Sequence, residues 1–148
     1  MPNRETERAV AEAATLETAR AATGAPAVAG AGSADPVAGE LRRAGVLPLL
    51  VLHLLGDGRS YGNRLIERIA EVSDGLLVVN PNTIYPLLRD LEARGLVAGE
   101  WEHPERRSRR FYALTDAGTA ERERLRAAVA PRLDAVALAV GRLRDELS

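Results

Sequence analysis

The side chains of this sequence that could perform recognition chemistry lie between Asn80 and Gly95. An apolar stripe at helical spacing would face inward there, and it consists of Ile84, Leu87, Leu88 and Leu91. The opposite face is polar, aromatic and cationic, and it presents Asn82, Tyr85, Pro86 and Arg89. Asparagine and arginine can make paired hydrogen bonds with base edges in a DNA major groove, and a tyrosine hydroxyl can bind a phosphate. The segment therefore predicts a helix that contacts DNA.

A cationic segment follows directly. The apolar pattern changes period after Gly95, and residues 102–106 contain turn-forming residues, so residues 96–114 predict a two-stranded hairpin with a polar tip. The basic residues near this tip are Arg106, Arg107, Arg109 and Arg110, and between Pro104 and Tyr112 only Glu105 opposes them. A local excess of positive charge of this kind is typical of segments that lie along a phosphate backbone.

The elements around these residues are predictable from their ends. Asn80 and Pro81 are suited to begin the recognition helix, and Gly95 is suited to follow its last turn in a left-handed conformation. Upstream, residues 46–55 form an almost wholly apolar helix, and Ser60 can cap another helix that runs to about residue 72. This order predicts a mainly α fold with a small β-hairpin, a winged helix-turn-helix with an added C-terminal helix.

The C-terminal segment predicts a long helix with one apolar seam. Thr115 can cap it, and the seam recurs at steps of three and four residues through Leu125, Val129, Leu133, Val136, Val140, Leu143 and Leu147. Pro131 should kink this helix. The seam could pack on the chain's own N-terminal helix or on a second copy. We favour a homodimer, because twofold symmetry is the usual way in which such proteins double their contact with DNA.

Composition divides the 148 residues into three parts. Residues 1–40 are an Ala-rich, acidic extension, expected to hold a weak helix and then a flexible linker over residues 23–39. Residues 41–114 form the predicted DNA-binding domain and carry 11 arginines against 9 acidic residues, although the whole chain has a formal net charge of only -1. Residues 115–148 form the predicted dimerisation helix.

Several classes of protein are not supported by the sequence. With no cysteine and only His53 and His103, no metal site is expected, and neither a phosphate-binding loop nor a catalytic motif indicates an enzyme or a cofactor. No apolar run is long enough to span a membrane, and no signal-peptide core is present near the N-terminus. We therefore expect a cytoplasmic protein without catalytic residues.

Three motifs resemble those of the PadR family of bacterial transcriptional regulators. A Tyr-Gly pair opens the second helix as Tyr61-Gly62, and two further signatures occupy the recognition helix and the end of the wing. Those two comprise Pro81, Thr83, Tyr85, Pro86 and Leu88, and then Tyr112, Leu114, Thr115 and Gly118. The match covers about residues 46–120 and is specific because the motifs occur together in this order.

The resemblance implies a homodimer joined through its C-terminal helices that represses a nearby gene and is released by a small molecule. Some members bind flat aromatic drugs between tryptophans of these helices, but residues 115–148 contain no Trp, Tyr, Phe or His, so no effector is identifiable.

We therefore expect a sequence-specific regulator that binds double-stranded DNA at a palindromic operator. The candidate DNA-binding residues are Tyr61, Asn82, Thr83, Tyr85, Pro86, Arg89, Arg106, Arg107, Arg109 and Arg110. The alternative is an adaptor that uses the same fold to bind protein, which the near-neutral net charge permits. Salt dependence distinguishes them, because DNA binding weakens steeply as salt rises.

Overall fold

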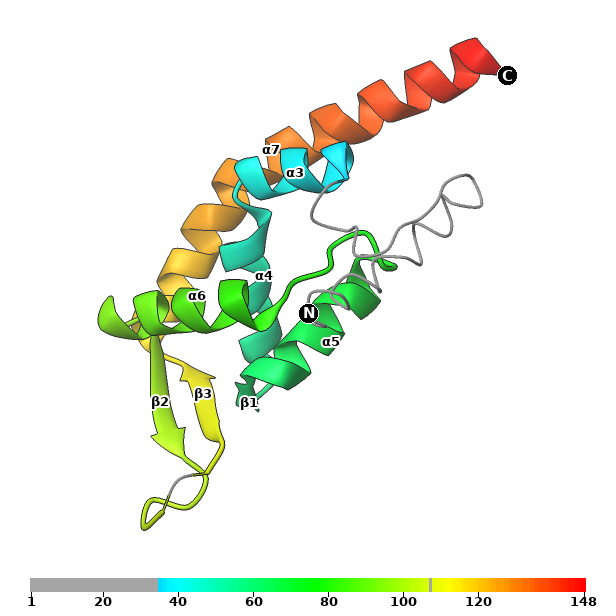
Figure 1. Ribbon diagram of the computed structural model, residues 1–148. Helices are drawn as coiled ribbons and strands as arrows, with labels where there is room; N and C mark the ends of the chain where they lie inside the picture. The colour runs from blue at the N-terminus through cyan, green and yellow to red at the C-terminus, as the bar shows by residue number, and fades with distance from the viewer. Residues whose placement is uncertain (1–34, 107) are drawn as a thin grey trace.

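The computed structural model describes residues 35–106 and 108–148. The predicted weak helix near the N-terminus and residue Arg107 lie outside the described residues. The elements in chain order are α3 (Pro36–Arg43), α4 (Val46–Leu55), β1 (Ser60–Tyr61), α5 (Gly62–Val72), α6 (Pro81–Ala93), β2 (Val97–Trp101), β3 (Arg110–Leu114) and α7 (Asp116–Leu147). Figure 1 shows a mainly helical molecule with a small sheet and a long C-terminal helix, as the sequence predicted.

The apolar helix α4 lies at the centre of the core and contacts α3, α5, β3 and α7. Its Val51 and Leu52 are fully buried, and Leu65 and Ile69 of α5 and Leu88 of α6 are buried with them. An all-round apolar helix can be buried in this way only when other elements cover every side of it. The core therefore fixes α6 against α5 and β2 through its inner stripe, and the outer face of α6 is left free.

The sheet differs from the predicted two-stranded hairpin by one short strand. Strand β3 pairs antiparallel with β2 on one side and with β1 on the other. Ser60, which we expected to cap α5, instead pairs with Tyr112 in the sheet, and α5 begins after Tyr61 without a side-chain cap. A two-residue strand has too short a pattern to be recognised in a sequence. Its effect is to fasten the wing to the start of α5.

The ends of α6 follow the predicted pattern only in part. At the C-terminal end, Gly95 has φ +76°, and the amides of Gly95 and Leu96 donate to the carbonyls of Glu92 and Leu91, which is a Schellman motif. At the N-terminal end, Asn80 takes the N-cap position, but its side chain does not cap the helix. The start of α6 must therefore be held by other contacts.

The N-terminal extension becomes regular earlier than expected. Helix α3 begins at Pro36, so residues 36–39, which we assigned to a flexible linker, are helical. Asp35 is responsible, because its Oδ1 accepts hydrogen bonds from the amides of Val37 (2.8 Å) and Ala38 (3.3 Å). An Asp-Pro pair at a helix start is a signal that the Ala- and Gly-rich composition of this stretch concealed.

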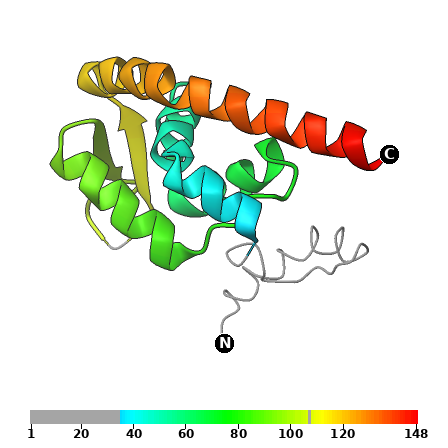
Figure 2. The same cartoon turned by 90° about the horizontal axis from the view of Figure 1, so that it is seen from above.

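Helix α7 divides the predicted seam into two parts. Leu125 packs against the core and Val129 is only 2 % exposed, so both are covered by the protein's own elements rather than by a partner. Beyond Pro131 the exposed fraction rises to 62 % at Leu143 and 82 % at Leu147. Figures 1 and 2 show α7 as one continuous helix that runs past the rest of the described chain, and in Figure 1 it bends near its middle. Only the second part of the seam is available to a second copy.

Candidate nucleic-acid interface

The outer face of α6 is the first part of the candidate interface. Asn82, Pro86 and Arg89 are exposed, as the helical spacing predicted, and Thr83 is half-buried near the start of the helix. Pro86 lies inside α6 and has no amide hydrogen to donate to the carbonyl of Asn82, four residues earlier. The face therefore offers an amide side chain, a guanidinium and a carbonyl without its helical donor.

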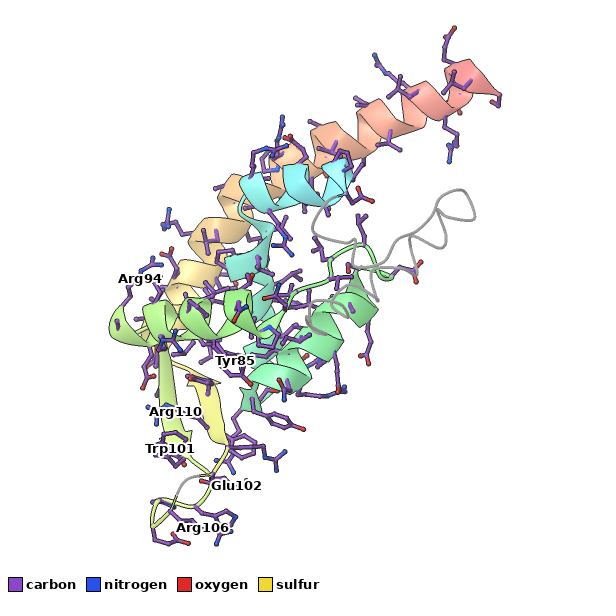
Figure 3. All side chains as sticks on the ribbon, in the orientation of Figure 1. Tyr85, Arg94, Trp101, Glu102, Arg106 and Arg110 are labelled. Atoms are coloured by element: carbon purple, nitrogen blue, oxygen red, sulfur yellow. The ribbon has the colours of Figure 1, made fainter. Side chains whose placement is uncertain are left out.

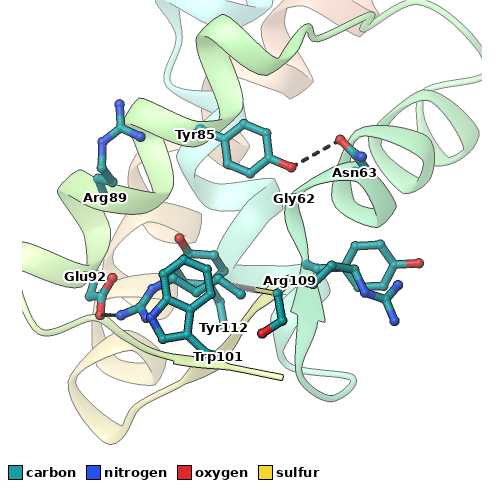
Figure 4. A pocket seen from close by; sticks show the side chains of 11 residues that line it. Gly62, Asn63, Tyr85, Arg89, Glu92, Trp101, Arg109 and Tyr112 are labelled. Carbon is teal, nitrogen blue, oxygen red and sulfur yellow. Dashed lines mark hydrogen bonds and ion pairs between the residues drawn. The ribbon is translucent and has the colours of Figure 1, made fainter. Parts of the chain in front are cut away.

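Tyr85 lies differently from the expectation that it shares this outer face. Its ring is half-buried against the start of α5, where its hydroxyl donates to Oδ1 of Asn63 at 3.2 Å (Figure 4). A Cβ atom at Gly62 would lie 2.5 Å from this ring, so only glycine leaves the ring enough room. Burial raises the pKa of the Tyr85 hydroxyl, the neighbouring Tyr112 adds to the rise, and the backbone amide of Asn63, as a donor to the hydroxyl oxygen, opposes it. The hydroxyl stays protonated and reaches the edge of a cleft.

The wing is the second part of the interface. Arg109 makes two hydrogen bonds to the Glu102 carboxylate, from Nε to Oε1 (3.2 Å) and from Nη2 to Oε2 (3.1 Å). These bonds lower the pKa of Glu102 and fix the guanidinium, whose Cζ also lies 4.4 Å from the ring centroid of Tyr61. Tyr61 packs edge-to-face on Phe111, with ring centroids 5.5 Å apart. Arg109 and Tyr61 thus lie side by side on the exposed surface of the sheet.

Arg110 does not have the role predicted for it. Its Nη2 donates to Oε2 of Glu92 at 2.6 Å and to the carbonyl of Gly99 at 3.2 Å, and its Cζ lies 5.2 Å from the ring centroid of Trp101. Successive side chains point to opposite faces of a strand, so Arg110 faces α6 whereas Arg109 faces away from it. Arg110 therefore fastens the wing to the recognition helix and is not free to bind a phosphate.

The tip of the wing carries Arg106. Its side chain is exposed and makes no ion pair with any other described residue. Figure 3 shows it at the far end of the hairpin, beyond Trp101 and Arg110. Trp101, the last residue of β2, is 42 % exposed.

A cavity of about 490 Å³ separates α6 from the wing. Tyr85 and Arg89 line one side of it, and Trp101 and Tyr112 of the wing line the other (Figure 4). Five of the ten predicted DNA-binding residues lie around this cavity, namely Tyr61, Tyr85, Arg89, Arg109 and Arg110. The contacts of these residues add three polar residues that the sequence did not single out, Asn63, Glu92 and Glu102. Glu92 is on α6 after Arg89 and outside the apolar stripe, so the sequence could have suggested a polar contact for it. Its partner Arg110 is distant in sequence, so the ion pair itself was not predictable.

Other kinds of site are not found in the described part of the chain. No group of three or more His, Cys, Asp or Glu side chains among residues 35–106 and 108–148 could hold a metal ion. None of the described helices combines the length and the apolar character needed to cross a membrane.

Comparison with known proteins is in keeping with this geometry. The model of the transcriptional regulator PadR-like family matches residues 51–124, from α4 to the first part of α7. A transcriptional regulator of Mycobacterium tuberculosis is 40% identical over 81 residues, which cover 55% of this chain and 72% of that protein. The chain belongs to the PadR-like family of transcriptional regulators.

Solved structures extend the PadR-like likeness to the fold. A PadR family regulator from Eggerthella lenta is 35% identical, with a TM-score of 0.53 over 70% of this chain and 85% of that chain. A PadR-like transcription factor from Bacteroides fragilis is 28% identical, with a TM-score of 0.52 over 71% of this chain and 99% of that chain. This PadR-like chain is therefore a transcriptional regulator with a winged helix-turn-helix fold, and it is not an enzyme.

Proposed function

We propose that this PadR-like regulator binds double-stranded DNA in a sequence-specific manner, with α6 in a major groove and the wing along the adjacent backbone. The observation that carries the proposal is that Asn82 and Arg89 are exposed on the outer face of α6, next to a wing with exposed Arg106 and Arg109. In this arrangement side chains of α6 would contact base edges, while the wing arginines and Tyr61 would contact phosphates. Thr83 and Tyr85 would reach the backbone at the edge of the groove.

Selection of fragments from a random pool of duplexes by the purified protein tests this function. We expect an enriched sequence that binds much more tightly than random duplex, and binding that weakens steeply between low and moderate salt. An adaptor that binds protein instead of DNA would enrich no sequence, and its association with DNA would be weak at every salt concentration.

We assign the three parts of the chain the tasks that their sequence predicted. Residues 41–114 would form the DNA-binding domain and residues 115–148 the dimerisation helix, while residues 36–40 of the extension belong to α3. A regulator of transcription acts where DNA lies, so its place would be the cytoplasm of a bacterial cell.

We further propose that two copies associate through the second half of α7. The residues of the seam that are exposed there are Leu133, Val140, Leu143 and Leu147, with exposed fractions from 36 % at Leu133 to 82 % at Leu147, and Val136 between them is half-buried. Burial of such side chains contributes about 25 cal/mol per Å² of apolar area. A second copy, related by a twofold axis, would bury both stripes at once and would place two α6 helices on a palindromic operator.

Sedimentation tests the dimer. The protein should be dimeric at micromolar concentration, and the double variant Val140→Glu, Leu143→Glu should be a folded monomer, because both side chains are exposed in one copy. Arg142→Glu adds an acidic residue to the same turn outside the seam and should stay dimeric. A double variant that remained dimeric would show that the second half of α7 is not the interface.

We also propose that a small molecule releases the protein from DNA, as the resemblance to the PadR family implies. The C-terminal helix has no aromatic side chain, whereas the cavity between α6 and the wing is lined by Tyr61, Tyr85, Trp101 and Tyr112. Trp101 is the one tryptophan of the chain, so its fluorescence reports directly on that cavity. A compound that releases the selected duplex without changing this fluorescence would bind elsewhere.

A further inference from the structure

Helix α3 contacts both the C-terminal helix α7 and the segment that leads into the recognition helix α6. On one side, Glu40 forms an ion pair with Arg132 of α7, immediately after the proline in that helix. On the other side, Nη2 of Arg42 donates to the carbonyl of Val78 at 2.8 Å, in the segment that leads into α6. Residues two apart on a helix point in nearly opposite directions. Figure 2 shows α3 between α7 and this segment, so one short helix connects the C-terminal helix with the start of the recognition helix.

The segment before α6 has few other ways to keep its shape. Residues 77–80 have no regular secondary structure, and the N-cap side chain of Asn80 makes no hydrogen bond to the helix. Leu77 and Val79 pack into the core, while the Val78 carbonyl accepts its hydrogen bond from Arg42. Val78 is buried as well, and the Leu77 amide donates to Oγ of Ser73 at 2.9 Å. The hydrogen bond from Arg42 is therefore the contact that ties this segment to α3, and it acts on the residue two positions before the N-cap of α6.

Arg42 is held in an unfavourable place for a charged side chain. Its guanidinium is half-buried, its Nε is buried without a hydrogen-bond partner among the described residues, and burial lowers its pKa. The Oδ1 atom of Asn80 is buried without a partner in the same part of the chain. A charge is disfavoured in such surroundings unless a specific contact compensates for it, and the hydrogen bond to Val78 is the contact that Arg42 makes.

We propose that Arg42 is a positioning residue for DNA recognition, which fixes the start of α6 through the Val78 carbonyl and connects it to α7 through α3. The inference rests on the proposed function, since its consequence is an effect on sequence selectivity. Arg42 lies on α3, which Figure 1 shows on the side of α6 away from the wing, so it acts through the orientation of α6 and not through contact with the wing. A small rotation of α6 would misplace Asn82 and Arg89 relative to base edges, whereas contacts between the wing and phosphates would persist.

Three variants of the full chain test this role. Arg42→Met keeps an apolar stem and removes the donor, Arg42→Lys keeps the charge but not the planar guanidinium, and Arg43→Met removes the exposed neighbouring cation as a control. For each variant we would measure the ratio of affinities for the selected and a random duplex, the salt dependence on the random duplex, the midpoint of thermal unfolding, and hydrogen exchange of the Ile84 and Tyr85 amides.

For Arg42→Met we expect the selected-to-random ratio to fall by about tenfold or more, because base contacts rather than phosphate contacts carry selectivity. Affinity for random duplex and its salt dependence should stay unchanged, and the two amides at the start of α6 should exchange faster. Arg42→Lys should show part of this loss, and Arg43→Met should behave like the original protein.

A folded Arg42→Met protein with an unchanged ratio would overturn the inference, and so would an equal loss in Arg43→Met. If Arg42→Met does not fold, Arg42→Lys decides, because an unchanged ratio in that variant would equally overturn it. Measurements on the original protein distinguish failure of the proposed function from failure of the positioning role. If it does not discriminate between the duplexes, the proposed function fails. If it discriminates and the Arg42 variants do so equally well, only the positioning role fails.

Discussion

Arg109 and Arg110 show how neighbouring residues of one type come to have different tasks. Both contribute equally to the positive charge of the wing in the sequence, yet Arg109 pairs with Glu102 on the exposed surface and Arg110 pairs with Glu92 of α6. The difference arises because side chains alternate between the two faces of a strand. A count of charges therefore overestimates the cations that are available to DNA, whereas Arg89 and Arg106 are exposed without an ion pair among the described residues.

Arg89 should contribute to selectivity. Arg89→Ala should weaken binding to the selected duplex by about 1 to 3 kcal/mol and relax the preference at one base position, because a guanidinium on the outer face of α6 can bind a base edge in a bidentate manner. Titration of the selected and random duplexes measures this effect, with the exposed Arg126→Ala on α7 as a control. An equal loss on both duplexes would mean that Arg89 contacts phosphate.

Substitutions of Arg106 and Arg110 should have different effects, the first on DNA binding and the second on stability. Arg106→Met should reduce the slope of log K against log salt by about one unit on every duplex and leave stability unchanged, because it removes one phosphate contact. Arg110→Met should instead lower the free energy of unfolding by about 1 kcal/mol, because it removes a partly buried ion pair. Salt titrations and chemical denaturation distinguish the two, and a reversal of these effects would contradict our assignment of Arg110.

At the scale of elements, the contact between α7 and the wing depends on very close packing. The Thr115 hydroxyl donates to the carbonyl of Gly95 at 2.7 Å and accepts the amide of Gly118 at 3.0 Å, so it links the end of α6 to the start of α7. A Cβ atom at Gly118 would lie 2.0 Å from the carbonyl oxygen of Leu96. Glycine is required at this position because a backbone atom occupies the space, and that explains the last residue of the wing signature.

Gly118→Ala should accordingly lower the free energy of unfolding by about 1 to 3 kcal/mol, since α7 must shift away from Leu96 to relieve the contact. The matched change Gly39→Ala in α3 would meet only the end of the Arg43 side chain at 3.6 Å. It should raise stability by about 0.5 to 1 kcal/mol, as expected for alanine in a helix. Thermal and chemical unfolding measure both, and an unaffected Gly118→Ala protein would contradict the described packing.

The sequence predicted those features of the elements that have a local physical cause. Helix spacing gave the inner and outer faces of α6, and the left-handed Gly95 and the capping Thr115 marked helix ends that the structure confirms. Features that depend on distant partners were not predictable. Examples are the pairing of Arg110 with Glu92, the inward turn of the Tyr85 ring over Gly62, and the burial of Val129 by the core rather than by a second copy.

At the scale of the whole molecule, the interface with DNA and the exposed half of α7 lie at opposite ends. Figure 1 shows the hairpin pointing away from the C-terminus, with α4 and the core between them. One copy would present one recognition helix, which is a small surface for selective binding. Association through α7 would combine two such helices without covering either of them, and the affinity of linked sites exceeds that of one site by about a hundredfold to ten-thousandfold when geometry allows both to bind.

The most direct test of this account is sedimentation of the protein with the selected duplex and with a duplex of equal length in which one half-site is scrambled. We predict two protomers on the intact site at micromolar concentration, and an affinity lower by about a hundredfold or more on the scrambled site. One protomer on the intact site, or equal affinity for the two duplexes, would contradict the account of a twofold dimer that recognises DNA through α6.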